Sequence, residues 1–343
     1  MKPSSPRSSG LSLLLGFALC GALLSAAPVR AQDEAADPFA IAREAYEAAA
    51  SPAAKLAIVE RFLTDHPAHA RFAAAVRAGK NVLLDELDDR QAAVDFVQRY
   101  LPLAPDDAAR DDLQDLLLDL YSHPDYAAAL TELVGRRYDL AAMTYVEHVR
   151  VLDAAAKAEA WGLLAKHAAA AESQANADAF RAAYPDRDFS EDYIADAGRN
   201  RQGLLRTYTG WAAANQGDLA RAEKDFEAAK TLVRKTFFGL PDNELYRFWG
   251  LTLLKQGRRD QGLEMLALAG LYGNDEAALA AAREAFTDQG RRQTSFDDYL
   301  WDLRRDRATK MADFTAVDYE DVQHAYTSLR GEKATLLAFW FPT

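Results

Sequence analysis

The sequence predicts a mostly α-helical protein whose C-terminal end changes to the first strands of a second domain. Three observations lead to this prediction. Apolar residues recur with the period of a helix face from about Pro38 to Arg305. One short motif occurs twice in that region, 38 residues apart. After Asp306 the helical period stops, and apolar and polar residues begin to alternate as they do in a strand.

Residues 1–31 have the composition of a secretory signal peptide. Lys2 and Arg7 precede an apolar run over residues 11–24, and small residues then lead to Ala31. The run is shorter than the roughly 20 apolar residues of a membrane-spanning helix. We therefore expect cleavage before Gln32, export to the periplasm and no stable membrane insertion of the mature chain.

Cys20 offers an alternative to simple cleavage, because a lipidated cysteine would anchor the chain to a membrane. The preceding residue is Leu19, which is larger than the small residue normal at that position, and the apolar run continues past the cysteine. Cleavage is therefore the favoured prediction. Since Cys20 is the only cysteine, the mature chain would contain no thiol.

Composition and motif spacing argue against several functions. The formal net charge of −12 would repel a phosphate backbone, so we expect no nucleic-acid partner. No nucleotide-binding or hydrolase motif is present, and we expect no cofactor. The histidines do not have the spacing of a metal site; they are His66, His69, His123, His148, His167 and His324.

The motif that occurs twice combines an aromatic residue with a later proline. Residues 60–63 (ERFL) precede Pro67 by the same spacing as residues 98–101 (QRYL) precede Pro105. A third aromatic, Phe180, also precedes a proline by five residues. Proline cannot continue a helix interior, so each motif predicts a helix that ends just after its aromatic residue.

A second pattern of small residues and one aromatic is clearest over residues 203–273. It resembles the tetratricopeptide repeat, in which small residues let two antiparallel helices approach. Its first copy comprises Gly210, Gly217, Ala222, Phe226 and Ala229, and the second keeps Gly250, Gly257 and Ala269. The copies lie 40 residues apart, beyond the usual 34, and lack the family's tryptophan and proline. The resemblance implies a degenerate α-solenoid over residues 38–305, with an irregular all-α bundle as the alternative.

The first copy also predicts two details of the helix junction. Gly217 is suited to a left-handed helix end, and Asp218 can cap the next helix.

The helical region contains no recognisable catalytic group. The function we expect from it is therefore binding of a partner peptide in a groove between helices. Aromatic candidates for this protein-binding groove are Trp211, Tyr246, Trp249 and Tyr272. Stacked helical repeats also bury their aromatic residues, so a core role for most of the four is favoured over contact with a partner.

Residues 308–343 have the pattern of strands. The segment 312–318 alternates between apolar and polar residues, and six consecutive apolar residues occupy 336–341. Such a run, rich in aromatics, predicts a central strand buried on both faces.

The order of these C-terminal elements resembles the redoxin superfamily, most closely the periplasmic thioredoxin-like oxidoreductases of the TlpA type. The matching residues are Asp313, Phe314, Thr315, Asp318, Leu329, Arg330, Gly331, Lys333, Leu337, Phe339 and Trp340. The sequence departs from the family at Ala312, which replaces a proline, at 320–321, where a glycine is usual, and by one extra residue before Lys333.

The resemblance implies where the redox site would lie. In the family the central strand leads to the first catalytic cysteine, which here would follow Thr343 directly. The flank of that site would be Trp340, Phe341, Pro342 and Thr343. We therefore expect no catalytic residue within the chain and expect the chain to be a fragment.

The implied function is that of an envelope thiol–disulfide oxidoreductase whose helical region binds client proteins or a redox partner protein. Two alternatives stay open. The chain could be a non-enzymatic helical scaffold, or residues 339–342 could belong to a peroxiredoxin-like antioxidant. Trp340 favours the thioredoxin-like prediction, because the peroxiredoxin pattern is Phe-aromatic-Tyr-Pro.

Overall fold

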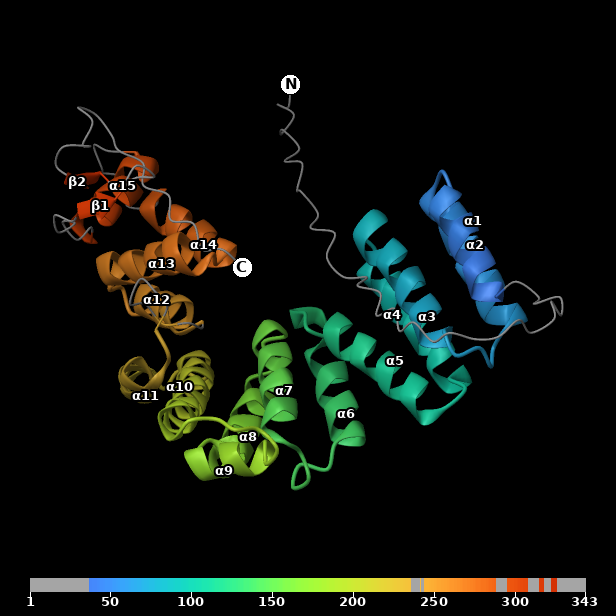
Figure 1. Cartoon of the computed structure of the whole chain (residues 1–343), viewed down its shortest axis with the longest axis horizontal. Helices are drawn as coiled ribbons and strands as arrows, with labels where there is room; N and C mark the ends of the chain where they lie inside the picture. The colour runs from blue at the N-terminus through green and yellow to red at the C-terminus, as the bar shows by residue number, and fades with distance from the viewer. Residues whose placement is uncertain are drawn as a thin grey trace.

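The computed structural model describes residues 37–235, 241, 244–287, 295–307, 315–317 and 322–325. Over these residues the chain is mostly helical, as predicted, and compatible with helical repeats. Its α-helices follow one another along an open arc (Figure 1). They are α1 (Pro38–Ala48), α2 (Pro52–Asp65), α3 (Phe72–Asn81), α4 (Arg90–Tyr100), α5 (Asp107–Leu120), α6 (Ala127–Arg137), α7 (Tyr145–Lys157), α8 (Trp161–Ala171), α9 (Ala177–Ala183), α10 (Glu191–Asn215), α11 (Leu219–Leu232), α12 (Leu245–Lys255), α13 (Arg259–Gly273), α14 (Glu276–Thr287) and α15 (Phe296–Arg307).

The aromatic–proline motifs end helices where the sequence predicts. Helix α2 ends two residues before Pro67, α4 ends at Tyr100 itself, and α9 ends three residues after Phe180. The three aromatic side chains of the motifs are buried. The first two copies also touch each other, because Arg99 Nη1 lies 3.2 Å from Glu60 Oε1. The motif therefore marks both a helix end and a contact between successive units.

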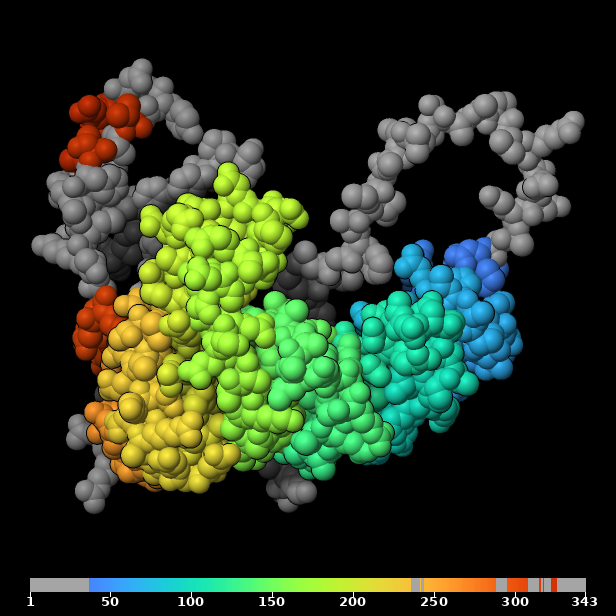
Figure 2. All heavy atoms as spheres, turned by 90° about the horizontal axis from the view of Figure 1, so that it is seen from below, coloured from blue at the N-terminus to red at the C-terminus, as the bar shows by residue number. Residues whose placement is uncertain are grey.

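Packing occurs mainly between helices that are close in the sequence. Each helix contacts its chain neighbour or the next helix but one, and Figure 2 shows the same order across the lower face of the molecule. The main hydrophobic core therefore extends along the array, from Val59 to Leu253, and a second cluster continues from Leu263 to Phe296. Helix α9 and the start of α10 form a projecting lobe with its own small cluster around Phe180.

Helices α10 and α11 pack closely because a glycine lies between them. A Cβ atom added to Gly210 would lie only 2.8 Å from the ring of Phe226. Gly217 has a φ of +89°, and the carboxylate of Asp218 accepts a hydrogen bond from Arg221 N at 3.1 Å. These three observations confirm the predicted close approach, left-handed turn and helix cap.

Helices α12 and α13 repeat this arrangement with other side chains. A Cβ on Gly250 would lie 2.8 Å from Leu266, and Gly257 has a φ of +76°. The two pairs share the local geometry of close-packed helical hairpins. A regular tetratricopeptide-like stack of the two pairs stays a prediction.

Two short strands follow the helices. Strand β1 (Thr315–Val317) pairs in antiparallel fashion with β2 (Gln323–Ala325), and Thr315 lies opposite Ala325. Strand β1 falls within the segment predicted to be a strand, residues 312–318. A two-stranded pair of this size occurs in many folds and identifies none of them. The central strand predicted over residues 336–341 lies outside the described residues.

Candidate functional site

Trp211, a candidate for the protein-binding groove, lies in the hydrophobic core. It is 8% exposed. Its ring stacks on Phe248 with 4.7 Å between ring centroids and meets Trp161 edge-on at 5.7 Å. Lys255 Nζ lies 5.1 Å from the same ring. The tryptophan therefore joins α8, α10 and α12, and little of its surface is free for a partner.

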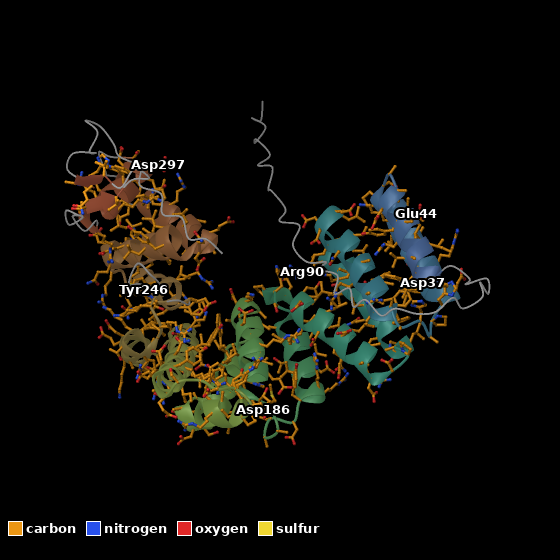
Figure 3. The ribbon with its side chains drawn as sticks, in the orientation of Figure 1. Asp37, Glu44, Arg90, Asp186, Tyr246 and Asp297 are labelled. Carbon is orange, nitrogen blue, oxygen red and sulfur yellow. The ribbon has the colours of Figure 1, made fainter. Side chains whose placement is uncertain are left out.

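Trp249 is buried as well, and the two tyrosines of the predicted groove are half-buried. Trp249 is 4% exposed and stacks on Phe226 at 5.9 Å, and its indole Nε1 has no hydrogen-bond partner among the described residues. Figure 3 shows Tyr246 on α12, in the C-terminal part of the arc. Burial raises the pKa of its hydroxyl. Tyr272, on α13, is also partly covered. The tryptophans thus have the core role that stacked repeats predict, and a partner contact of the tyrosines stays a prediction.

The predicted flank of the redox site, residues 340–343, lies outside the described residues.

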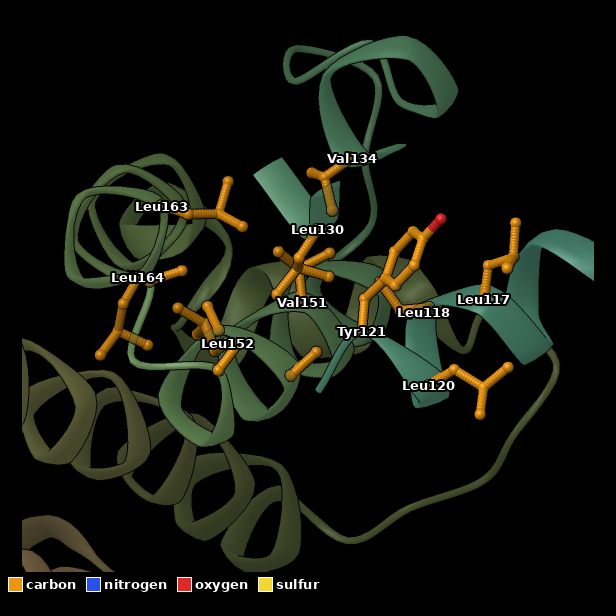
Figure 4. Packing of buried hydrophobic residues seen from close by; sticks show 14 of the residues in the cluster. Leu117, Leu118, Leu120, Tyr121, Leu130, Val134, Val151, Leu152, Leu163 and Leu164 are labelled. Carbon is orange, nitrogen blue, oxygen red and sulfur yellow. The ribbon is translucent and has the colours of Figure 1, made fainter. Parts of the chain in front are cut away.

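An apolar groove lies between α6 and α8, with a volume of about 470 Å³. Figure 4 shows part of the core next to the groove, where Leu130 and Val134 of α6, Val151 of α7 and Leu163 of α8 belong to one hydrophobic cluster. Aromatic rings of Tyr138 and Trp161 add to the apolar lining. The neighbouring core residues Leu130 and Val151 are fully buried, so the helices that form the groove are closely packed on their inner side. The groove is therefore a preformed depression in the surface.

Small side chains keep this groove open. On α6 the lining residues Ala127, Thr131 and Gly135 are spaced four residues apart and so share one face of the helix. Gly135 and, on α8, Gly162 have no atom within 4 Å of the position of an added Cβ. The space between the two helices therefore has room for a ligand or a partner side chain.

Among the described residues, Lys166 is the only charged side chain that lines the groove at neutral pH, because the histidine beside it is neutral. His167 is 2% exposed, and burial, with smaller contributions from His148 and Lys166, lowers its pKa to about 4. No carboxylate lines the groove, and Lys166 forms no ion pair with any described residue. The groove is thus apolar with one positive charge at its edge.

His167 forms a buried hydrogen bond with a second histidine. His148 is fully buried, and its Nδ1 lies 3.2 Å from His167 Nδ1. One ring must donate its Nδ1 proton and the other must accept it, so the accepting ring is neutral in this arrangement. Burial lowers the pKa of His148 as well, and its Nε2 has no hydrogen-bond partner. The pair joins α7 to α8 directly behind the groove.

A second cleft, between α8, α10 and α11, has a polar lining and a volume of about 560 Å³. Its central acid is Asp225, which is 5% exposed and lies 2.9 Å from Arg206 Nη1. Arg221 Nε lies 3.7 Å from the other oxygen of the same carboxylate. The acid is neutralised by these two arginines, so the interaction explains the packing of α10 on α11 and requires no ligand.

Sequence analysis missed both the histidine pair and the groove. His148 and His167 are 19 residues apart on different helices, so no spacing rule connects them.

Within the described part of the chain, no group of three or more His, Cys, Asp or Glu side chains is placed to hold a metal ion. Among the described helices, none combines the length and the hydropathy needed to span a bilayer. The chain matches no family model, no curated protein and no solved structure.

Proposed function

We propose that this chain is the client-binding part of an envelope thiol–disulfide oxidoreductase. The observation that carries the proposal is the order of redoxin-like elements over residues 312–343, which follows the helical array directly. The helical array supports it as well, because an open arc of helices offers a large surface to a protein partner (Figure 1).

The chemistry of such a site depends on the junction between a strand and a helix. The positive N-terminal end of the helix lowers the pKa of the first cysteine and favours its thiolate. That thiolate attacks a client disulfide, forms a mixed disulfide and releases one client thiolate. The second cysteine then displaces the other client sulfur and closes the enzyme disulfide. In this proposal residues 340–343 hold the first cysteine at the end of the central strand.

The coding sequence beyond codon 343 tests this proposal. A C-x-x-C motif that begins at the next codon supports the oxidoreductase. A T-x-x-C motif would instead support the peroxiredoxin-like antioxidant, and a stop codon would leave a non-enzymatic helical scaffold.

Activity gives a second test. We expect the chain extended through C-x-x-C to reduce insulin in a turbidity assay, and a variant with both cysteines changed to serine to be inactive. The chain of 343 residues is expected to be inactive, because Cys20 is its only thiol and lies in the signal peptide. Turnover by the shorter chain would contradict the requirement for the missing dithiol.

The alternative proposal is a non-enzymatic tetratricopeptide-like adaptor. The α6–α8 groove favours it, because a preformed apolar depression serves binding without any redox group.

Both proposals place the mature chain in the periplasm. Export with cleavage predicts that the protein purified from the periplasm begins at Gln32. A product that begins at Cys20 and carries lipid would contradict simple cleavage and support the lipoprotein alternative.

A further inference from the structure

We propose that the α6–α8 groove binds a single-chain amphiphile with a carboxylate head group. The acyl chain would lie along the apolar groove, and the carboxylate would pair with Lys166 at its edge. This inference is independent of the proposed redox function, since it uses only residues of the helical array.

The shape and the polarity of the groove favour an acyl chain. Its volume of about 470 Å³ lies in the range of small-molecule sites, which are apolar with a few polar groups. Its walls are helices, whose backbone amides are bonded within each helix. An extended peptide would bury its own amides in the groove without partners, at a cost of free energy. An acyl chain has no amide groups, so its entry leaves no backbone donor or acceptor unpaired.

The charge of the groove favours a carboxylate over a cation. Lys166 lies one turn after Gly162 on α8, so its ammonium group and the open space at the glycine are on one face of the helix. Ala160, which precedes α8 and also lines the groove, provides no side-chain acceptor for the first turn. The positive end of this helix therefore adds to the charge of Lys166. The described lining of the groove therefore has one cationic side chain and no acid, which favours an anionic head group over a cationic one.

Isothermal titration calorimetry with the purified chain tests the proposal. The probe is dodecanoate below its micelle concentration, compared with decanoate and with dodecyltrimethylammonium. We expect one dodecanoate to bind per chain. Decanoate should bind about tenfold more weakly, because two fewer methylenes are buried. The cationic probe has the same alkyl chain but should bind about tenfold more weakly than dodecanoate, because its head group would face Lys166 instead of pairing with it.

Variants locate the site. Lys166→Gln should weaken dodecanoate binding about fivefold, as expected for the loss of one exposed ion pair. Gly135→Leu should abolish binding, because the new side chain fills the open space. Gly135→Leu also replaces glycine with a better helix former, so the fold is expected to persist, as circular dichroism will verify. The matched control is Lys224→Gln in the polar cleft, which should leave the affinity unchanged.

Three results would overturn the proposal. The first is the absence of dodecanoate binding. The second is equal binding of the cationic and anionic probes, which would remove the role of Lys166. The third is dodecanoate binding that Gly135→Leu does not reduce, which would place the site elsewhere.

Discussion

Replacing Phe226 with alanine is expected to lower the free energy of unfolding by about 3–5 kcal/mol, the usual cost of removing a buried aromatic side chain. Phe226 is fully buried. Its ring lies in the space that Gly210 leaves on α10, and its other neighbour is Trp249 of α12, whose ring centroid is 5.9 Å away. The substitution would leave a cavity where α10, α11 and α12 meet.

Urea denaturation followed by far-ultraviolet circular dichroism measures this loss. Trp301→Ala is the matched control, because Trp301 is 65% exposed and its removal should change the free energy by less than about 0.5 kcal/mol. A loss below about 1 kcal/mol for Phe226→Ala would show that the ring does not support the junction between the two helix pairs.

Acidification is expected to destabilise the protein through the buried histidine pair. The folded-state pKa of His167 is about 4, against an ordinary value of 6.5, because burial penalises the charged ring. Between these two values the unfolded state binds more protons than the folded state, so stability falls as the pH decreases from 6.5 towards 4. A shift of this size corresponds to about 3 kcal/mol for His167 alone. His148, whose pKa is also lowered by burial, acts in the same direction.

The pH dependence is assigned by comparing variants in denaturation experiments at pH 7, 5.5 and 4.5. A double variant, His148→Leu with His167→Leu, removes both partners of the hydrogen bond and should lose stability less steeply with acid. His123→Gln is the control, since His123 is half-exposed beside Asp125 and lies outside the core. An unchanged pH slope in the double variant would show that the pair does not titrate in this range.

Much of the helical architecture was predictable because its signals are local. A proline five residues after an aromatic predicts a helix end without any knowledge of the rest of the fold, as α2 and α9 illustrate. Gly217 and Asp218 could be assigned for the same reason, because the left-handed turn and the helix cap involve only neighbouring residues.

The binding features could not be predicted, because they depend on which helices lie side by side. The sequence does not show that Gly135 and Gly162 face the same open space, or that His148 meets His167 across α7 and α8. For Trp211 and Trp249, the sequence identifies the residues but does not decide between a groove position and a core position. An aromatic residue in a repeat can line a groove or fill the core, and only the packing of α12 against α10 and α11 places both in the core.

The sequential packing of the helices has a mechanical consequence. When the two ends of the arc are pulled apart, the load passes through interfaces between helices that lie one or two places apart in the sequence, because the described array has no extensive contact between distant helices. The chain should then yield first where the interface is sparse. Helix α6 touches α5 and α7, and α15 touches α14, far less extensively than α10 touches α11, so tension would release α15 or open the array beside α6 while the α10–α11 pair stays closed.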